Sequence, residues 1–233
     1  MANTHLYGFR FFRSISGGGD CPQIITSPIA SGYAPVTVFG AGVACNLNIG
    51  DPIRQLIDGS VIIAQAGQAT DGSDNGDYVA GVVVGFPRVT VGGAVRPGSF
   101  YASGTTYTGG IGSDTATLVA WIPAEGNIFE LDAAAVIGAG TKNAALAVVG
   151  GTSNYTYTVL SSGIGQPKAN PMIGTPVTNS AQINQLRIVG LGKKNDAMDF
   201  ASANVAFQVM FNEIQARPSV AAGGLPGSSA FLP

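Results

Sequence analysis

Short apolar runs alternate with turn residues along most of the chain. Turn-forming pairs such as Asp58-Gly59, Asn75-Gly76 and Gly92-Gly93 occur about every ten residues, and β-branched or alternating runs lie between them. This spacing is typical of an all-β sandwich or barrel. Because Asp58-Gly59 directly separates two apolar runs, we expect a tight hairpin at that position.

The apolar runs form two series, one on each side of Pro123. The first series predicts strands at residues 52–57, 60–64, 79–86, 88–91, 100–102 and 115–122. The second predicts strands at residues 128–131, 144–149, 155–160, 186–191 and 204–214. In the last of these, alternate positions of "VAFQVMF", starting at Val205, place the apolar side chains on one face. In "YTYTVL" the threonines alternate with the tyrosines, as in a half-buried strand.

The two series predict two small β-sandwich or barrel-like domains, at residues 21–123 and 124–215. Trp121, in the run "TLVAWIP", is expected in the core. Residues 161–181 carry three prolines and little periodicity, which is typical of an ordered loop with a functional or interfacial role. Extended arms are predicted at residues 1–20 and 216–233.

Both predicted arms carry hydrophobic side chains. The N-terminal arm contains an aromatic cluster followed by three consecutive glycines, residues 17–19. The C-terminal arm carries an apolar pair near its end. The cluster either closes one end of the first domain or packs on another chain. The glycines favour the second interpretation, because they uncouple the cluster from the first domain. The predicted subunit or capsid contacts are Leu6, Tyr7, Phe9, Phe11, Phe12, Phe231 and Leu232.

Charge is scarce and unevenly distributed. Charged residues make up 10% of the chain and apolar ones 45%, and 34 of the 233 residues are glycine, which indicates a folded protein with a packed core and little helix. The formal net charge is -2, yet residues 133–195 contain no Asp or Glu. The cations in that span are Lys142, Lys168, Arg187, Lys193 and Lys194. They are too few and too scattered for direct nucleic-acid binding, so we expect a weakly positive face that meets an acidic neighbour.

The sequence predicts neither export nor membrane insertion. Arg10 and Arg13 lie within and after the aromatic cluster, unlike the charges of a signal peptide. No apolar run approaches the roughly 18 residues that cross a membrane. Cys21 and Cys45 could pair, but two cysteines in a chain of this size are more often free thiols. The cysteines therefore do not determine the redox compartment, and we expect synthesis in the cytoplasm.

The residue types that catalysis needs are poorly represented. His5 is the only histidine, and it lies on a predicted arm, so we expect neither a nucleophilic triad nor a zinc site. Glu125 and Glu130 flank the start of a predicted strand without a supporting catalytic pattern. We therefore predict that the chain has no catalytic residue and no cofactor.

The stretch "DGSDNGD" is similar to a calcium-binding loop, with Asp71, Asp74 and Asp77 as candidate ligands. An EF-hand loop needs a bidentate Glu at its twelfth position, where this sequence has Val82. A calcium site of another type stays open beside the simpler interpretation, a solvated hairpin turn at Asn75-Gly76.

Seven segments carry a resemblance to a known family. They are, in order, "YGFRF", "GDPIRQLIDGSVIIA", "YVAGVVVGF", "GNIFELDA", "KNAALAVVGG", "NQLRIVGLGKKND" and "ANVAFQVMFNEIQ". The ordered series, over residues 7–215, resembles virion structural proteins of tailed bacteriophages, in particular head decoration or cement proteins. The resemblance implies an all-β protein without catalytic residues. It also implies the major capsid protein and further copies of the chain, as homodimer or homotrimer, as partners.

The leading hypothesis is a cement protein on the outside of a phage head, made in the host cytoplasm, whose arms hold neighbouring subunits. Deleting residues 1–18 is then expected to leave a folded protein that no longer occupies heads. One alternative is a virion surface module that binds host glycans through "YASGTTYTGG", with Tyr101 and Tyr107. Another is a major capsid or tail component.

Overall fold

The structure is a computed structural model, and it is mostly β. It describes residues 8–15, 21–30, 47–66, 78–91, 94–98, 117–160, 168–174, 176, 184–192, 199–212 and 214, without the side chains of residues 88–91, 94–98, 158–160 and 168–170. Of the described part, 52% lies in strands and 5% in helix. The predicted all-β fold class is therefore confirmed.

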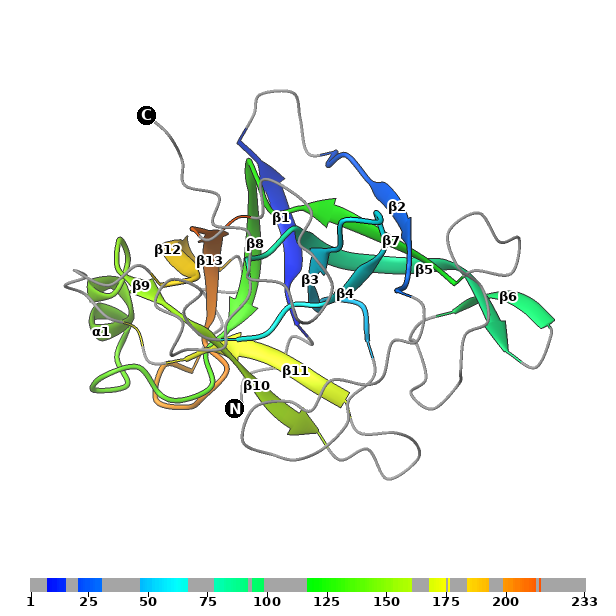
Figure 1. Cartoon of the computed structure of the whole chain (residues 1–233). Helices are drawn as coiled ribbons and strands as arrows, with labels where there is room; N and C mark the ends of the chain where they lie inside the picture. The colour runs from blue at the N-terminus through cyan, green and yellow to red at the C-terminus, as the bar shows by residue number, and fades with distance from the viewer. Residues whose placement is uncertain are drawn as a thin grey trace.

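One antiparallel sheet has five strands, and it combines the beginning of the chain with its second half (Figure 1). In spatial order the strands are β1 (Arg10–Ser14), β8 (Asn127–Asp132), β13 (Ala206–Phe211), β12 (Leu186–Leu191) and β9 (Thr152–Ser153). The predicted alternation holds in β13, where Phe207, Val209 and Phe211 are buried and Gln208 and Met210 are half-buried. This sheet therefore presents an apolar face to the core.

A second sheet is formed by the first half of the chain. Its strands are β2 (Ile25–Pro28), β7 (Leu118–Pro123), β5 (Gly81–Val91), β3 (Pro52–Gln55) and β4 (Val61–Ile63), with β6 (Ala94–Gly98) pairing with β5. The predicted hairpin at Asp58-Gly59 is confirmed, because β3 and β4 pair antiparallel around Gly59, which has a φ of 83°. A parallel bridge between Ile29 and Val61 joins the two ends of the strand order, so the sheet curls towards a barrel.

Two elements correct the sequence interpretation. Residues 144–149, predicted as a strand, begin inside helix α1 (Lys142–Ala147) and end in a turn. The Thr141 side chain caps this helix by accepting from the backbone N–H of Ala144, and the alanine-rich sequence favours helix. Within the predicted loop 161–181, β11 (Lys168–Ile173) pairs antiparallel with β10 (Tyr155–Leu160).

Most of the other predicted strands are present. The bounds of β10 and β12 are those expected, and the two predicted strands 79–86 and 88–91 form the single strand β5. The sequence interpretation missed β1, β2, β6 and β9. The predicted strand at residues 100–102 lies outside the described residues.

The core consists of two clusters, and the larger one includes residues from both sides of Pro123. In that cluster Ala64 and Val82 from the first half pack with Phe129 and Phe207 from the second half. The smaller cluster lies within the second sheet. It contains Trp121, which is 5% exposed, as predicted for a core residue. The predicted division into two domains is not confirmed.

Hydrogen bonds from three side chains also join the two halves, in an arrangement we call the tyrosine clasp. The hydroxyl of Tyr157 donates to the carbonyl of Ala64 at 2.7 Å, and that of Tyr155 donates to the carbonyl of Gln65 at 2.7 Å. The Gln185 amide donates to the same Gln65 carbonyl at 3.0 Å. The clasp satisfies two backbone carbonyls beyond the end of β4, which would otherwise need other partners.

Candidate functional site

Residues 8–15 are the part of the predicted N-terminal arm that the structure describes, and β1 within them lies at one edge of the five-stranded sheet. It pairs antiparallel with β8, with Arg10 opposite Glu130 and Phe11 opposite Phe129. The register then shifts by one residue, so that Arg13 lies opposite Ile128 and Phe12 forms a bulge. Residues 10–14 of the predicted arm therefore form a strand of the five-stranded sheet.

Phe9 precedes β1 and belongs to the core. Its side chain is 4% exposed, and its ring centroid lies 4.8 Å from that of Phe211, 5.8 Å from that of Tyr155 and 6.2 Å from that of Phe129. We name this set of three rings the aromatic pocket. Phe9 is therefore a core residue in the described chain, and its predicted contact with another subunit stays a prediction.

The backbone next to Phe9 fits the protein closely. The Phe9 amide donates to the carbonyl of Gly50 at 2.9 Å. Gly8 has a φ of 80°, and a Cβ at this position would lie 2.7 Å from the same Gly50 oxygen. Only glycine combines this φ with such a close approach. The start of β1 is therefore held against the segment that leads into β3.

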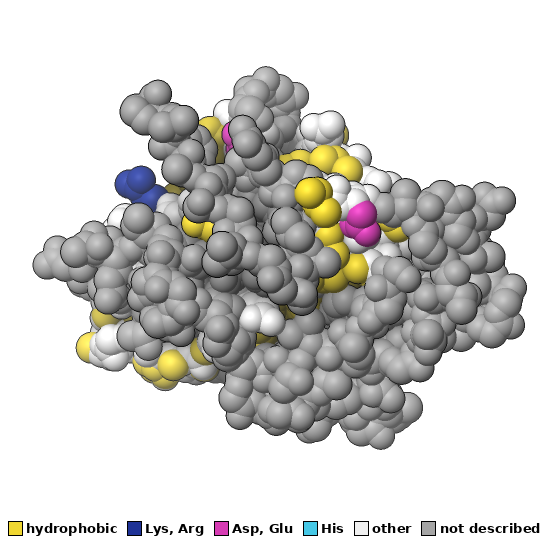
Figure 2. All heavy atoms as spheres, viewed as in Figure 1, with side chains coloured by type: hydrophobic (Ala, Val, Ile, Leu, Met, Phe, Trp, Pro, Cys, Tyr) yellow, Lys and Arg dark blue, Asp and Glu magenta, His cyan; other side chains and the backbone are white. Residues whose placement is uncertain are grey.

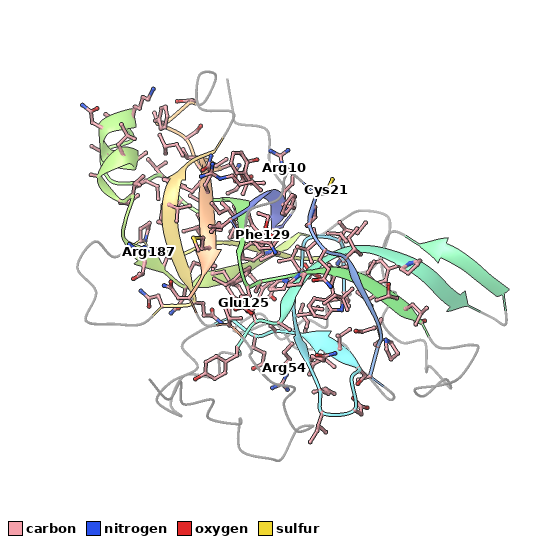
Figure 3. The ribbon with its side chains drawn as sticks, turned by 90° about the horizontal axis from the view of Figure 1, so that it is seen from above. Arg10, Cys21, Arg54, Glu125, Phe129 and Arg187 are labelled. Atoms are coloured by element: carbon pink, nitrogen blue, oxygen red, sulfur yellow. The ribbon has the colours of Figure 1, made fainter. Side chains whose placement is uncertain are left out.

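Arg10 forms an ion pair with Glu130 across the β1–β8 ladder. The Glu130 side chain is 2% exposed, whereas that of Arg10 is 51% exposed. Figure 3 shows Arg10 extending from the edge of the sheet, with Phe129 further inside. A buried carboxylate requires a charged or hydrogen-bonding partner, so this ion pair fixes which residue of β1 faces Glu130.

The other side chains of the segment remain partly exposed. Phe12 is half-buried, and the guanidinium of Arg13 lies 5.8 Å from its ring centroid, which is a cation–π contact. Ile15 is 50% exposed and Ile24 is 59% exposed. Phe11 is half-buried and packs on Phe129, with 6.3 Å between the ring centroids.

Ile15 and Ile24 lie at the same end of the fold, where β7 turns into β8. The Ile15 amide donates to the carbonyl of Gly126 at 2.7 Å, within that turn. Ile25 pairs with Trp121 in the β2–β7 ladder, which places Ile24 level with Ile122 at the end of β7. We call the region formed by Phe12, Arg13, Ile15 and Ile24 the corner surface.

Other large apolar side chains are exposed elsewhere. They are Ile49, Ile57, Val136 and Leu146, with exposed fractions from 42% to 69%. In Figure 2, hydrophobic side chains of the described part reach the surface in separate groups, with few charged ones among them. The corner surface differs from these groups because Ile15 and Ile24 are the first and last residues of the connection between β1 and β2.

Several predicted site residues lie outside the described residues. These are the contact residues Leu6, Tyr7, Phe231 and Leu232, the calcium candidates Asp71, Asp74 and Asp77, and the glycan candidates Tyr101 and Tyr107. Within the ranges that the structure does describe, no group of three His, Cys, Asp or Glu residues could hold a metal ion. Cys21 is an exposed free thiol, and Glu125 is exposed at the β7–β8 turn.

The sequence interpretation missed Ile15 and Ile24 as surface residues. Their signal was weak, because an isolated isoleucine beside a glycine-rich stretch is compatible with burial as well as exposure. Comparisons with protein-family models, curated proteins and solved structures found no match to this chain. Among the described residues, no helix has the length and apolar character needed to cross a membrane.

Proposed function

We propose that the chain is a structural protein of a tailed-phage virion. It decorates the outside of the head, where it binds the major capsid protein and further copies of itself. Three features support this proposal: the ordered resemblance over residues 7–215, the mostly β structure and the low content of charged residues. The chain's function is then to supply contact area to neighbouring subunits.

The corner surface is the observation that carries the proposal. Ile15 is 50% exposed and Ile24 is 59% exposed, and Phe12, on the same segment as Ile15, is half-buried. Covering the rest of each isoleucine contributes about 1 kcal/mol, since full burial is worth about 1.5–3 kcal/mol. A single such contact is weak. Repeated over the symmetric copies on a shell, weak contacts give strong attachment.

Deletion of residues 1–18 does not test attachment separately from folding. Deleting residues 1–18 removes all of β1 and takes Phe9 out of the aromatic pocket. The deletion therefore tests folding together with attachment. Substitutions of exposed side chains separate the two effects, because they leave the core unchanged.

The test uses the double variant Ile15→Ser with Ile24→Ser, and Ile57→Ser as the matched control. Ile57 is 69% exposed and lies at the β3–β4 turn, away from the corner surface. Each protein is expressed during infection, and copies per purified virion are counted by quantitative mass spectrometry. We expect wild-type occupancy for the control and at least about tenfold lower occupancy for the double variant, since each 1.4 kcal/mol lost is a factor of ten.

Circular dichroism and thermal unfolding should show that both variants fold like the wild type. The proposal fails if the wild-type chain is absent from purified virions. The assignment of the corner surface fails if the folded double variant occupies virions as fully as the control.

A further inference from the structure

We propose that β1 is exchanged between two copies of the chain, so that β1 of each copy pairs with β8 of the other. This inference rests on the proposed function, since it specifies how copies are joined. The exchanged product is a two-fold symmetric dimer. In it, each β1 makes the contacts with β8 and the aromatic pocket that it makes within one chain.

The anchors of β1 do not depend on the connection between β1 and β2. Phe9 fills the aromatic pocket, Gly8 fits against Gly50, and Arg10 pairs with Glu130. Strand β1 comes from the start of the chain, while Glu130 is separated from Arg10 by 120 residues. A β1 from a second copy supplies the same groups to the same sites.

The connection after β1 suits exchange in both composition and length. Residues 16–20 read Ser-Gly-Gly-Gly-Asp, without a large side chain to anchor them. The chain from Ile15 to Ile24 spans up to about 30 Å when extended. It joins strands of two different sheets, β1 and β2. Three consecutive glycines lower the conformational cost of either route, to the chain's own β8 or to that of a second copy.

Exchange also gives the exposed isoleucines a partner. Ile15 and Ile24 flank the connection, with exposed fractions of 50% and 59%. In a two-fold dimer with exchanged β1 strands, each chain crosses to the other copy between Ile15 and Ile24, which brings these isoleucines to the interface between the copies. Burying this apolar surface is a gain that the single chain does not have.

Simple edge-to-edge pairing of two β1 strands is disfavoured by the same segment. Phe12 forms a bulge, and the exposed Arg10 and Arg13 would face the same positive charges on a second β1. Bulges and charges are features by which edge strands avoid pairing with one another. Exchange keeps Arg10 with a carboxylate and therefore avoids this repulsion.

The Arg10–Glu130 pair provides a direct test with full-length chains. Arg10→Glu places two acids together within one chain, and Glu130→Arg places two bases together. When the two variants are mixed and refolded, reciprocal exchange restores an acid–base pair in both halves of the dimer. In one half the two introduced residues face each other, and in the other half the two unchanged residues, Arg10 and Glu130, do so. We expect native mass spectrometry to show a dimer of the combined mass.

The control is the double variant Arg10→Glu with Glu130→Arg, refolded with the wild type. Its charges match within one chain, and exchange with the wild type would mismatch both pairs. We expect at least about tenfold less mixed dimer in the control than in the mixture of single variants, a difference of 1.4 kcal/mol or more. If the single variants fold only when mixed, that rescue also supports exchange.

Exchange is overturned if the double variant folds but the mixed single variants give no dimer of combined mass. If the double variant does not fold, wild-type chains of two isotopic masses are refolded together, and the absence of mixed dimers overturns exchange. These measurements use purified protein without phage heads. An exchanged dimer that never occupies virions refutes the proposed function alone, and a monomer that occupies them refutes exchange alone.

Discussion

Replacing Phe9 with alanine should destabilise the whole fold. The Phe9 side chain is 4% exposed and makes ring contacts with Phe211, Tyr155 and Phe129 at centroid distances of 4.8, 5.8 and 6.2 Å. Removing a buried phenylalanine costs about 3–5 kcal/mol, because transfer energy and packing are both lost. Since the free energy of unfolding of a domain is ordinarily about 5–15 kcal/mol, this variant would lose a large part of its stability.

The measurement is equilibrium unfolding in urea, monitored by fluorescence. Trp121 is the only tryptophan in the chain, and it is 5% exposed in the smaller core cluster. Its emission therefore reports whether losing Phe9 in one cluster destabilises the other as well. We expect the Trp121 transition to move to lower urea by an amount equivalent to about 3–5 kcal/mol, without a change in its slope.

Phe12→Ala is the matched control, since the same residue type lies three positions away on the same segment. Phe12 is half-buried, and the Arg13 guanidinium lies 5.8 Å from its ring centroid. The cation–π contact is worth about 0.5–1 kcal/mol and the half-burial of the ring about 1 kcal/mol, so this variant should lose about 1–2 kcal/mol. Equal losses for the two variants, or a loss below about 1 kcal/mol for Phe9→Ala, would refute the placement of Phe9 in the core.

Three further substitutions test the packing between and within the sheets. Tyr157→Phe removes the hydroxyl that donates to Ala64 at 2.7 Å and should cost about 1 kcal/mol; an unchanged thermal unfolding temperature would argue against the tyrosine clasp. Gly81→Ala should cost about 1–3 kcal/mol, because a Cβ there would lie 2.3 Å from the Trp121 ring. Gly85→Ala should be close to neutral, because no atom lies within 4 Å of its added Cβ. A larger loss of stability for Gly85→Ala than for Gly81→Ala in urea unfolding would contradict the described packing.

The short, locally encoded features were predictable from the sequence. The alternation that predicts β10 and β13 repeats every second residue; β13 buries the expected face, and in β10 Tyr155 is buried while Thr156 is exposed. The Asp58-Gly59 hairpin depends on the five residues between β3 and β4, among them a glycine with a φ of 83°. Burial of Trp121 was predictable from its apolar surroundings in sequence.

Helix α1 shows where local patterns compete. The run from Lys142 to Val149 is apolar enough for a short buried strand, and periodicity over so few residues does not separate strand from helix. The Thr141 cap and the alanines favour the helix. Local sequence also does not separate the three phenylalanines of the candidate site. Phe9 is buried, Phe11 packs on Phe129 and Phe12 lies at a bulge.

The sequence by itself determined that this chain forms strands, where most of the turns lie and which face of several strands is apolar, because those properties depend on neighbouring residues. Only the tertiary structure decided that β1 joins a sheet built from the other half of the chain, and that both halves share one core cluster. The physical reason is distance along the chain. Arg10 and Glu130 meet across 120 residues, and such pairing depends on how complete sheets pack and on which charges they bury.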